Sequence, residues 1–189
     1  MRLVKRLPLA LPEFRPDGSF FDDLTQSGAK HPGYSLSSGA KDNFPNCISL
    51  RATTGTGARL TAPARCSNFE AEIAMRRIEG TVRMHFRWAD TQNRIHVGFD
   101  GTNDRIYLTK VVDNVSSSLG AKANIGNQSL HAVGVRAIGS LIEVYLDGAR
   151  VIVATVSELI NNVQFNLDVY DAAIGTARGE FKYLAIKPL

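Results

Sequence analysis

The sequence has no long hydrophobic run and no excess of one charge. No segment approaches the roughly 18 to 20 consecutive apolar residues that a membrane-spanning helix needs, so we expect no integral membrane protein. The 22 basic residues are nearly balanced by 18 acidic ones, which leaves a net charge of +4, and like charges do not form blocks. We therefore expect neither a membrane nor a nucleic acid as partner.

Cysteine and histidine are also scarce. The two cysteines, Cys47 and Cys66, leave open either a disulfide or two small buried thiols. The four histidines lack the close spacing of a zinc site. The segment Asp100–Asp104 offers oxygen atoms of the kind that bind calcium, but a plain hairpin turn explains the same residues. We expect no metal and no cofactor.

The chain divides into two parts by composition. Residues 1–45 are rich in Pro, Gly, Ser and Asp, which predicts an extended arm and a loop-rich lead-in. Within it we expect a short helical turn at Phe20–Leu24 and an edge strand at Tyr34–Ser37. The apolar run near the N-terminus is short and interrupted by proline, so no cleavable signal peptide is evident. Residues 46–189 form the second part, a single β domain.

Alternation of apolar and polar residues recurs through this second part and predicts about ten short strands. In one of them, Val82–Trp88, alternate residues share an apolar face that ends with Trp88. Asp147-Gly148 is typical of a two-residue hairpin turn, the polar stretch Ser116–Gly126 separates strands, and Ser157–Asn162 predicts a helical turn. The main predicted strands are Phe69–Arg76, Val82–Trp88, Ile95–Phe99, Arg105–Val112, Leu130–Ala137, Leu141–Leu146, Arg150–Val156, Val163–Tyr170 and Glu180–Ile186.

Half-buried strands in this number need a second sheet to cover their apolar faces. The sequence therefore predicts an all-β fold, an antiparallel two-sheet jelly-roll sandwich with an extended N-terminal arm. No repeat of 20 to 50 residues occurs, which disfavours a propeller or a solenoid.

Several segments resemble the concanavalin A-like lectin and glucanase superfamily, which includes laminin-G-like modules. The resemblance covers about residues 46–189 and consists of packing and hairpin patterns, so it implies the fold more strongly than the function. The segments that carry it are Phe69–Ile73, Val82–Trp88, Asn93–Phe99, Arg105–Leu108 and Ile142–Val151.

Polar side chains on neighbouring strands form one candidate site. In a curved sheet they would line the concave side, where the resemblance implies that extended sugars bind. Arg and Asn donors, Asp acceptors and tyrosine rings suit a hydroxyl-rich ligand, although the same alternation is typical of a face that meets water or a protein partner. The candidate glycan face comprises Arg83, His85, Arg87, Arg94, His96, Tyr107, Tyr145, Asn166, Asp168 and Tyr170.

A further alternative is a polysaccharide lyase. Arg94–His96 and Gln164–Tyr170 resemble, in order, the Gln-Ile-His and Tyr-Phe-Lys-x-x-x-Tyr strands of alginate-lyase-type enzymes, with Arg94 in place of Gln and Asn166 in place of Lys. The resemblance implies that the histidine or the last tyrosine takes a proton beside a uronate carboxylate. The Glu-x-Asp-x-x-Glu strand of retaining glucanases is absent from the sequence.

The leading hypothesis from the sequence is a non-enzymatic structural or binding module, such as a capsid decoration or tail protein of a phage virion. It rests on the lack of a catalytic constellation and on an N-terminal segment that suits an extended arm along a neighbouring subunit. Expected partners are other subunits, in a homo-oligomer or a virion, with a glycan as the alternative, and the expected location is a virion or the extracellular space. The arm residues expected to contact a partner are Arg2, Leu3, Val4, Lys5, Leu7, Leu9 and Leu11.

Overall fold

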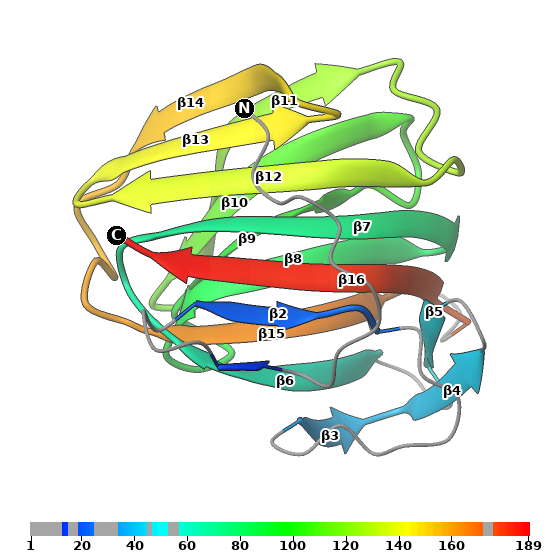
Figure 1. The fold of residues 1–189 in the computed structure, drawn as a ribbon. Coiled ribbons are helices and arrows are strands. Elements are labelled where there is room, and N and C mark those ends of the chain that lie inside the picture. The colour runs from blue at the N-terminus through cyan, green and yellow to red at the C-terminus, as the bar shows by residue number, and fades with distance from the viewer. Residues whose placement is uncertain (1–12, 15–18, 25–33, 45–46, 53–56, 172–175) are drawn as a thin grey trace.

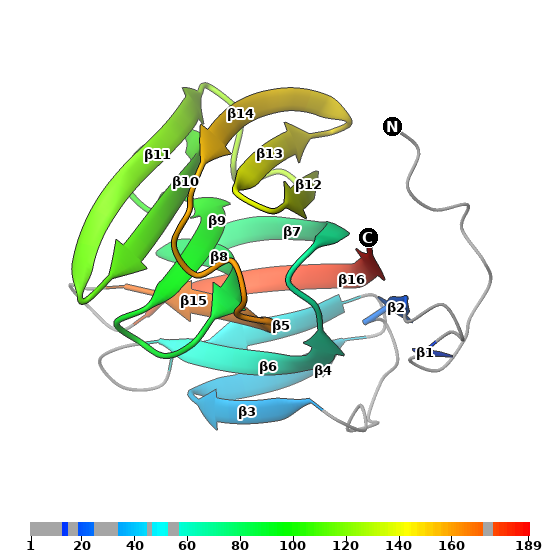
Figure 2. The same ribbon diagram turned by 90° about the vertical axis from the view of Figure 1, so that its left-hand side faces the viewer.

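The computed structural model describes residues 13–14, 19–24, 34–44, 47–52, 57–171 and 176–189. The seven candidate arm residues, which fall between positions 2 and 11, lie outside this part. The described residues form two antiparallel sheets that pack face to face, so the predicted all-β sandwich is confirmed (Figures 1 and 2). Within these ranges no helix is long and apolar enough to cross a membrane.

The first sheet has nine strands. Its main path runs in the order β1, β2, β16, β7, β12, β13, β14, and β5 pairs with both β16 and β4 beside that path. The strands are β1 (Glu13–Phe14), β2 (Phe20–Asp22), β4 (Ala40–Phe44), β5 (Cys47–Arg51), β7 (Phe69–Glu79), β12 (His131–Ile138), β13 (Leu141–Leu146), β14 (Ala149–Thr155) and β16 (Arg178–Pro188).

The second sheet has seven strands in the order β11, β10, β9, β8, β15, β6, β3. Figure 2 shows it lying against the first sheet, with β11 and β14 close together at one end of the sandwich. The strands are β3 (Ser35–Ser38), β6 (Ala58–Arg65), β8 (Thr81–Trp88), β9 (Arg94–Phe99), β10 (Arg105–Val112), β11 (Val115–Ala123) and β15 (Gln164–Tyr170).

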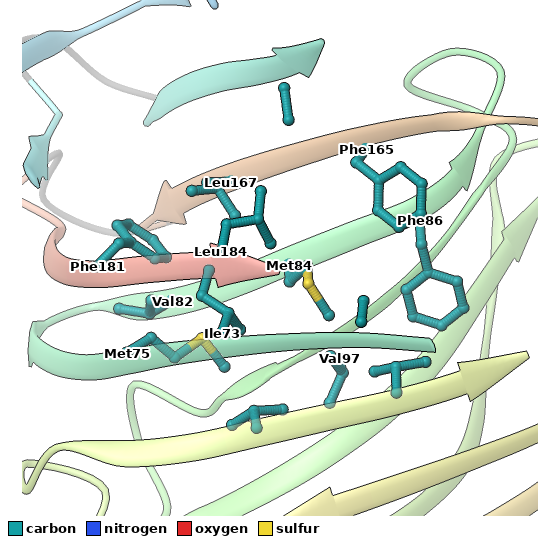
Figure 3. Packing of buried hydrophobic residues seen from close by; sticks show 14 of the residues in the cluster. Ile73, Met75, Val82, Met84, Phe86, Val97, Phe165, Leu167, Phe181 and Leu184 are labelled. Carbon is teal, nitrogen blue, oxygen red and sulfur yellow. The ribbon is translucent and has the colours of Figure 1, made fainter. Parts of the chain in front are cut away.

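The core lies between the sheets and follows the two-residue period of the sequence (Figure 3). On β8 the side chains of Val82, Met84 and Phe86 are fully buried against the first sheet. Phe69 on β7 makes an edge-to-face contact with Phe165 on β15, with ring centroids 4.7 Å apart. Since successive strand residues point to opposite faces, this burial directs the intervening polar residues of β8, β9 and β15 outward.

Turn chemistry explains the hairpins. Asp147 and Gly148 have φ angles of 51° and 86°, the left-handed pair that a two-residue hairpin between β13 and β14 requires, so that prediction is confirmed. Asp113 and Asn114, with φ angles of 50° and 64°, join β10 to β11 in the same way.

Three local predictions were wrong. Phe20–Leu24 is no helical turn, because Phe20–Asp22 pairs with β16 as a strand and satisfies its backbone there. The polar stretch from Ser116 forms most of β11, whose exposed edge position needs no apolar face. Ser157–Asn162 contains a hydrogen-bonded turn with Leu159 at a φ of 61°, not a helical one.

Cys47 and Cys66 are free thiols.

Candidate functional site

A set of polar and aromatic side chains covers the outer face of the seven-stranded sheet, which we call the polar face. Strand pairing brings its members together, because His85 lies directly opposite both His96 on β9 and Asn166 on β15. Asp168 lies opposite Arg83 and, on its other side, Arg59. The polar face comprises Arg59, Thr61, Arg83, His85, Trp88, Arg94, His96, Tyr107, Thr109, Asn166, Asp168 and Tyr170.

Asp168 is the carboxylate of this face, and it is almost completely buried, with 4% of its side chain exposed. It accepts a 2.8 Å hydrogen bond from Arg83 Nε and a second bond from Arg83 Nη2, while Arg59 Nη2 lies 3.3 Å from its other oxygen. Burial alone would raise the pKa of Asp168, but the Arg83 guanidinium, with His85 and Arg59, holds it well below its ordinary value. Asp168 is therefore ionised, and two guanidinium groups share it.

Gly98 makes room for Arg83. A Cβ atom at Gly98 would lie 2.8 Å from Arg83 Cγ and 2.4 Å from the carbonyl oxygen of Val82. The absence of a side chain at this position on β9 lets the Arg83 side chain lie across the neighbouring strand. The ring of Tyr170 then packs against the guanidinium, with Arg83 Cζ 4.7 Å from the ring centroid.

Two buried histidines occupy the centre of the face. The ring centroids of His85 and His96 are 5.0 Å apart, and Tyr107 makes an edge contact with His96 at 5.6 Å. Burial lowers the pKa of His85 to about 4 and that of His96 well below its ordinary value, so both imidazoles are neutral at pH 7. His85 Nε2 lies 3.6 Å from Asp168 Oδ1, too far for a direct hydrogen bond.

A local irregularity places Trp88 on the polar face. Arg87 has a φ of 48°, which breaks the alternation of β8 after Phe86. As a result Trp88 makes an edge contact with His85 at 4.9 Å and lies beneath two guanidiniums, with Arg59 Cζ 4.3 Å and Arg94 Cζ 5.6 Å from its ring centroid.

The sequence expectation for this strand end was therefore wrong. Trp88 does not continue the apolar face, and Arg87 does not join the polar face. The fully buried Arg87 guanidinium donates to the carbonyl oxygens of Ser67 and Gly139, which lie outside the strands of the polar face. Its role in the structure is to satisfy two backbone carbonyls.

Tyr145 is the other candidate that lies elsewhere. It belongs to β13 of the nine-stranded sheet, where its hydroxyl donates to Glu143. The structure thus brings eight of the ten sequence candidates together and leaves out Arg87 and Tyr145. It adds four residues that the sequence analysis missed, Arg59, Thr61, Trp88 and Thr109. The alternation of Ala58–Arg65 was a usable signal for the first two, since every second residue there is small or apolar.

Many nitrogen atoms on the polar face are buried without a hydrogen-bond partner among the described residues. Asn166 accepts a 2.7 Å bond from Thr61 through Oδ1, yet its Nδ2 has no partner. Such atoms are rare in folded proteins because each carries a desolvation cost. They can bind the oxygen atoms of a ligand. The unpartnered nitrogens are Arg59 Nε, His85 Nδ1 and Nε2, Arg94 Nε and Nη1, His96 Nδ1 and Asn166 Nδ2.

The acidic loop after β9 is built as a turn. Asp100 accepts hydrogen bonds from the backbone of Thr102 and from the Arg105 side chain, and Asp104 accepts from the backbone of Gly126 and Asn127. These N–H donors take the oxygens that a calcium ion would need. In the part of the chain that the structure describes, no group of three or more His, Cys, Asp or Glu residues could hold a metal ion.

The fold is that of the concanavalin A-like jelly-roll sandwiches, as the sequence resemblance implied. A carbohydrate-binding module, CBM66 from Bacillus subtilis, superposes with a TM-score of 0.69 at 20% identity over 82% of this chain and 95% of that one. A β-1,3-1,4-glucanase (lichenase) from a mouse hindgut metagenome gives 0.74 at 11% identity over 90% and 99%. The VIP36 exoplasmic/lumenal domain in its Ca2+/Man3GlcNAc-bound form gives 0.66 at 10% over 93% and 90%. No family profile and no curated protein matches the chain.

These similarities contradict two expectations from the sequence. The leading hypothesis, a non-enzymatic structural module of a virion, is wrong on this finding, because the similar structures include a carbohydrate-binding module, glucanases and a domain bound to Man3GlcNAc. The expectation that the chain is not an enzyme is contradicted by the glucanases and transglycosylases among them. At these identities the likeness establishes the fold, and the function has to be argued from the polar face.

Proposed function

We propose that the protein recognises carbohydrate through the polar face. The observation that carries this proposal is the set of buried nitrogen atoms, unpartnered among the described residues, that lie beside aromatic rings on one face of one sheet. Sugar hydroxyls are both donors and acceptors, so they can pair with Asn166 Nδ2 and with either nitrogen of a neutral imidazole. Tyr107 and Tyr170, which are both partly exposed, supply the apolar surface that a sugar ring covers, while the buried Trp88 ring supports Arg59 and Arg94.

Glycan cleavage is a second candidate, favoured by the neutral state of the two histidines. A neutral imidazole can accept a proton, and Tyr107, which touches His96, can donate one. A retaining mechanism with two carboxylates has little support here, because Asp168 is the one acid among the described strand residues of this face and it is bound to Arg83. Elimination at a uronate would need no second carboxylate.

The experiment is affinity electrophoresis of the full chain in native gels that contain soluble glycans, charged and neutral. We expect retardation in at least one glycan. Trp88→Ala removes the ring beneath two guanidiniums and should weaken binding at least about tenfold, equivalent to about 1.4 kcal/mol. Asn166→Ala is the second variant, because it removes less buried volume, and each variant is checked for an unchanged thermal unfolding transition.

Tyr145→Ala is the matched control. It also removes an aromatic ring from an outer sheet face, but on the nine-stranded sheet, so binding should not change. Equal weakening by Tyr145→Ala and Asn166→Ala would contradict the polar face as the binding site. The same glycans are incubated with the protein and assayed for new reducing ends and for ultraviolet absorbance from unsaturated products, which separates cleavage from binding alone.

A further inference from the structure

The charges of the polar face do not balance. Three guanidiniums, those of Arg59, Arg83 and Arg94, lie on this face with the single carboxylate of Asp168. The two central histidines are neutral at pH 7 and add no charge. Because Arg is ionised at every accessible pH, the face retains two positive charges that the described residues do not neutralise.

Arg94 is the guanidinium without an acidic partner. Arg83 and Arg59 both contact Asp168, whereas no carboxylate of the described residues lies within ion-pair distance of Arg94. Its Nε and Nη1 atoms are buried and make no hydrogen bond to any residue that the structure describes. Burial lowers the pKa of Arg94, which means that its surroundings resist its charge. A half-buried cation whose Nε and Nη1 atoms are cut off from water gains from an anion that brings a negative charge to it.

The Trp88 ring positions Arg94 through a cation–π contact. The Cζ atom of Arg94 lies 5.6 Å from the ring centroid of Trp88, and Arg59 Cζ lies 4.3 Å from the same centroid. Arg94 is also two residues from His96 on the same strand, so both side chains point to the same face. The guanidinium thus stands beside the buried donors that the proposed function assigns to sugar hydroxyls. A planar guanidinium can bind a carboxylate through two parallel hydrogen bonds.

We infer that the ligand is an acidic glycan, a chain of sugars that bear carboxylate or sulfate groups, and that Arg94 binds the acid group. This inference rests on the proposed function, since it names the class of sugar that the same face takes. His85, His96 and Asn166 bind hydroxyls beside the acid. Arg83 and Arg59 remain paired with Asp168, and these three side chains form the base of the site on which the ligand lies.

The test compares acidic with neutral polymers in affinity gels of the full chain. The probes are polygalacturonate and alginate for carboxylates, a sulfated galactan for sulfate, and a neutral β-glucan and a neutral galactan. We expect stronger retardation by at least one acidic polymer than by either neutral one, and weakening with added salt. Arg94→Gln should lower the affinity for that acidic polymer about tenfold or more.

Arg150→Gln is the matched control, because it removes the same charge from the outer face of the nine-stranded sheet, where Arg150 is 57% exposed and paired with Glu143. Its affinity should equal that of the wild type. Equal weakening by both variants would show attraction to net charge alone and overturn the inference. Retardation by neutral polymers only would overturn the acidic ligand while leaving carbohydrate recognition intact. If no polymer retards the protein, the proposed function fails, and the inference fails with it.

Discussion

The outer faces of the two sheets are both polar, but they use their polar groups differently. On the nine-stranded sheet, Glu143 accepts bonds from Arg150 at 2.6 Å, from Arg136 at 3.2 Å and from the Tyr145 hydroxyl at 3.2 Å. On the seven-stranded sheet, nitrogen atoms of His85, His96, Asn166, Arg59 and Arg94 are buried without a partner among the described residues. The polar groups of the first face satisfy one another, whereas the second face holds polar atoms that no described residue satisfies and that we propose bind a ligand.

Burial separates the two faces as well. The guanidiniums that bind Asp168 are 11% and 25% exposed, for Arg83 and Arg59, whereas those that bind Glu143 are 37% and 57% exposed, for Arg136 and Arg150. Removing one partner of an ion pair that is shielded from water costs more folding stability, because water cannot solvate the charge that remains. The same chemical change should therefore have unequal effects on the two faces.

The largest effect is expected from Asp168→Asn. The substitution keeps the shape of the side chain but leaves the Arg83 guanidinium buried without its anion, which should cost about 3 kcal/mol of unfolding free energy. Glu143→Gln, the matched change on the other face, should cost much less because water reaches its partners. Urea unfolding of both variants at pH 7 measures the difference. Equal losses would mean that the two faces do not differ in the way that burial indicates.

The sequence predicted the sandwich because burial on one side of each strand enforces a two-residue period, and Val82, Met84 and Phe86 show it plainly. It also placed His85, His96 and Asp168 on one face, since they follow the same period. It placed Trp88 and Arg87 on the wrong faces. The left-handed backbone of Arg87 shifts the alternation there, and the sequence pattern gives no sign of this shift.

Strand β6 shows a second reason for what the sequence left out. Pro63 lacks an N–H group, which is unusual inside a sheet. The structure accommodates it where the pairing with β15 shifts register, between the partners Arg65 and Thr61. Local preference therefore argued against the strand that carries Arg59. Tyr145 was misplaced for a different reason, because alternation gives the face of a residue within its own sheet but not which of two sheets it belongs to.

The next largest effect is a dependence of folding stability on pH, which we expect from the buried histidine His85 of the polar face. The pKa of His85 is about 4 in the folded protein and near its ordinary value of about 6.5 in the unfolded chain. The unfolded state therefore binds more protons between these values, so stability is complete above about pH 6.5 and falls as the pH falls. Between pH 7 and pH 5, His85 alone should account for a loss of about 2 kcal/mol. Asp168, whose pKa is lowered, and Arg83, whose pKa is raised, keep their charge over this range, and Arg59 is the other charged group that acts on His85.

Urea unfolding at pH 7, 6 and 5 measures this dependence in the wild type and in His85→Gln, whose side chain does not titrate. The variant should lose less stability than the wild type over the same interval. His131→Gln is the control. His131 lies on β12 of the nine-stranded sheet, not on the polar face, and its Nδ1 lies 2.8 Å from Asp147 Oδ2. A pH profile of His85→Gln that runs parallel to the wild type would contradict a neutral, buried His85.

The smallest effect concerns two strand glycines, one on each outer face. Gly98→Ala would place a Cβ atom 2.4 Å from the Val82 carbonyl oxygen and 2.8 Å from Arg83 Cγ, so it should displace the backbone or Arg83 and cost about 1.5 kcal/mol. Gly134→Ala meets only the side chain of Tyr145, with its Cβ at 3.2 Å, and should change stability by less than about 1 kcal/mol. Thermal unfolding measures the stability of both variants. Glycan affinity should fall in Gly98→Ala alone, because this change displaces Arg83, which is paired with Asp168 at the base of the proposed site. An equal loss of affinity in Gly134→Ala would show that the polar face does not depend on how Arg83 is seated.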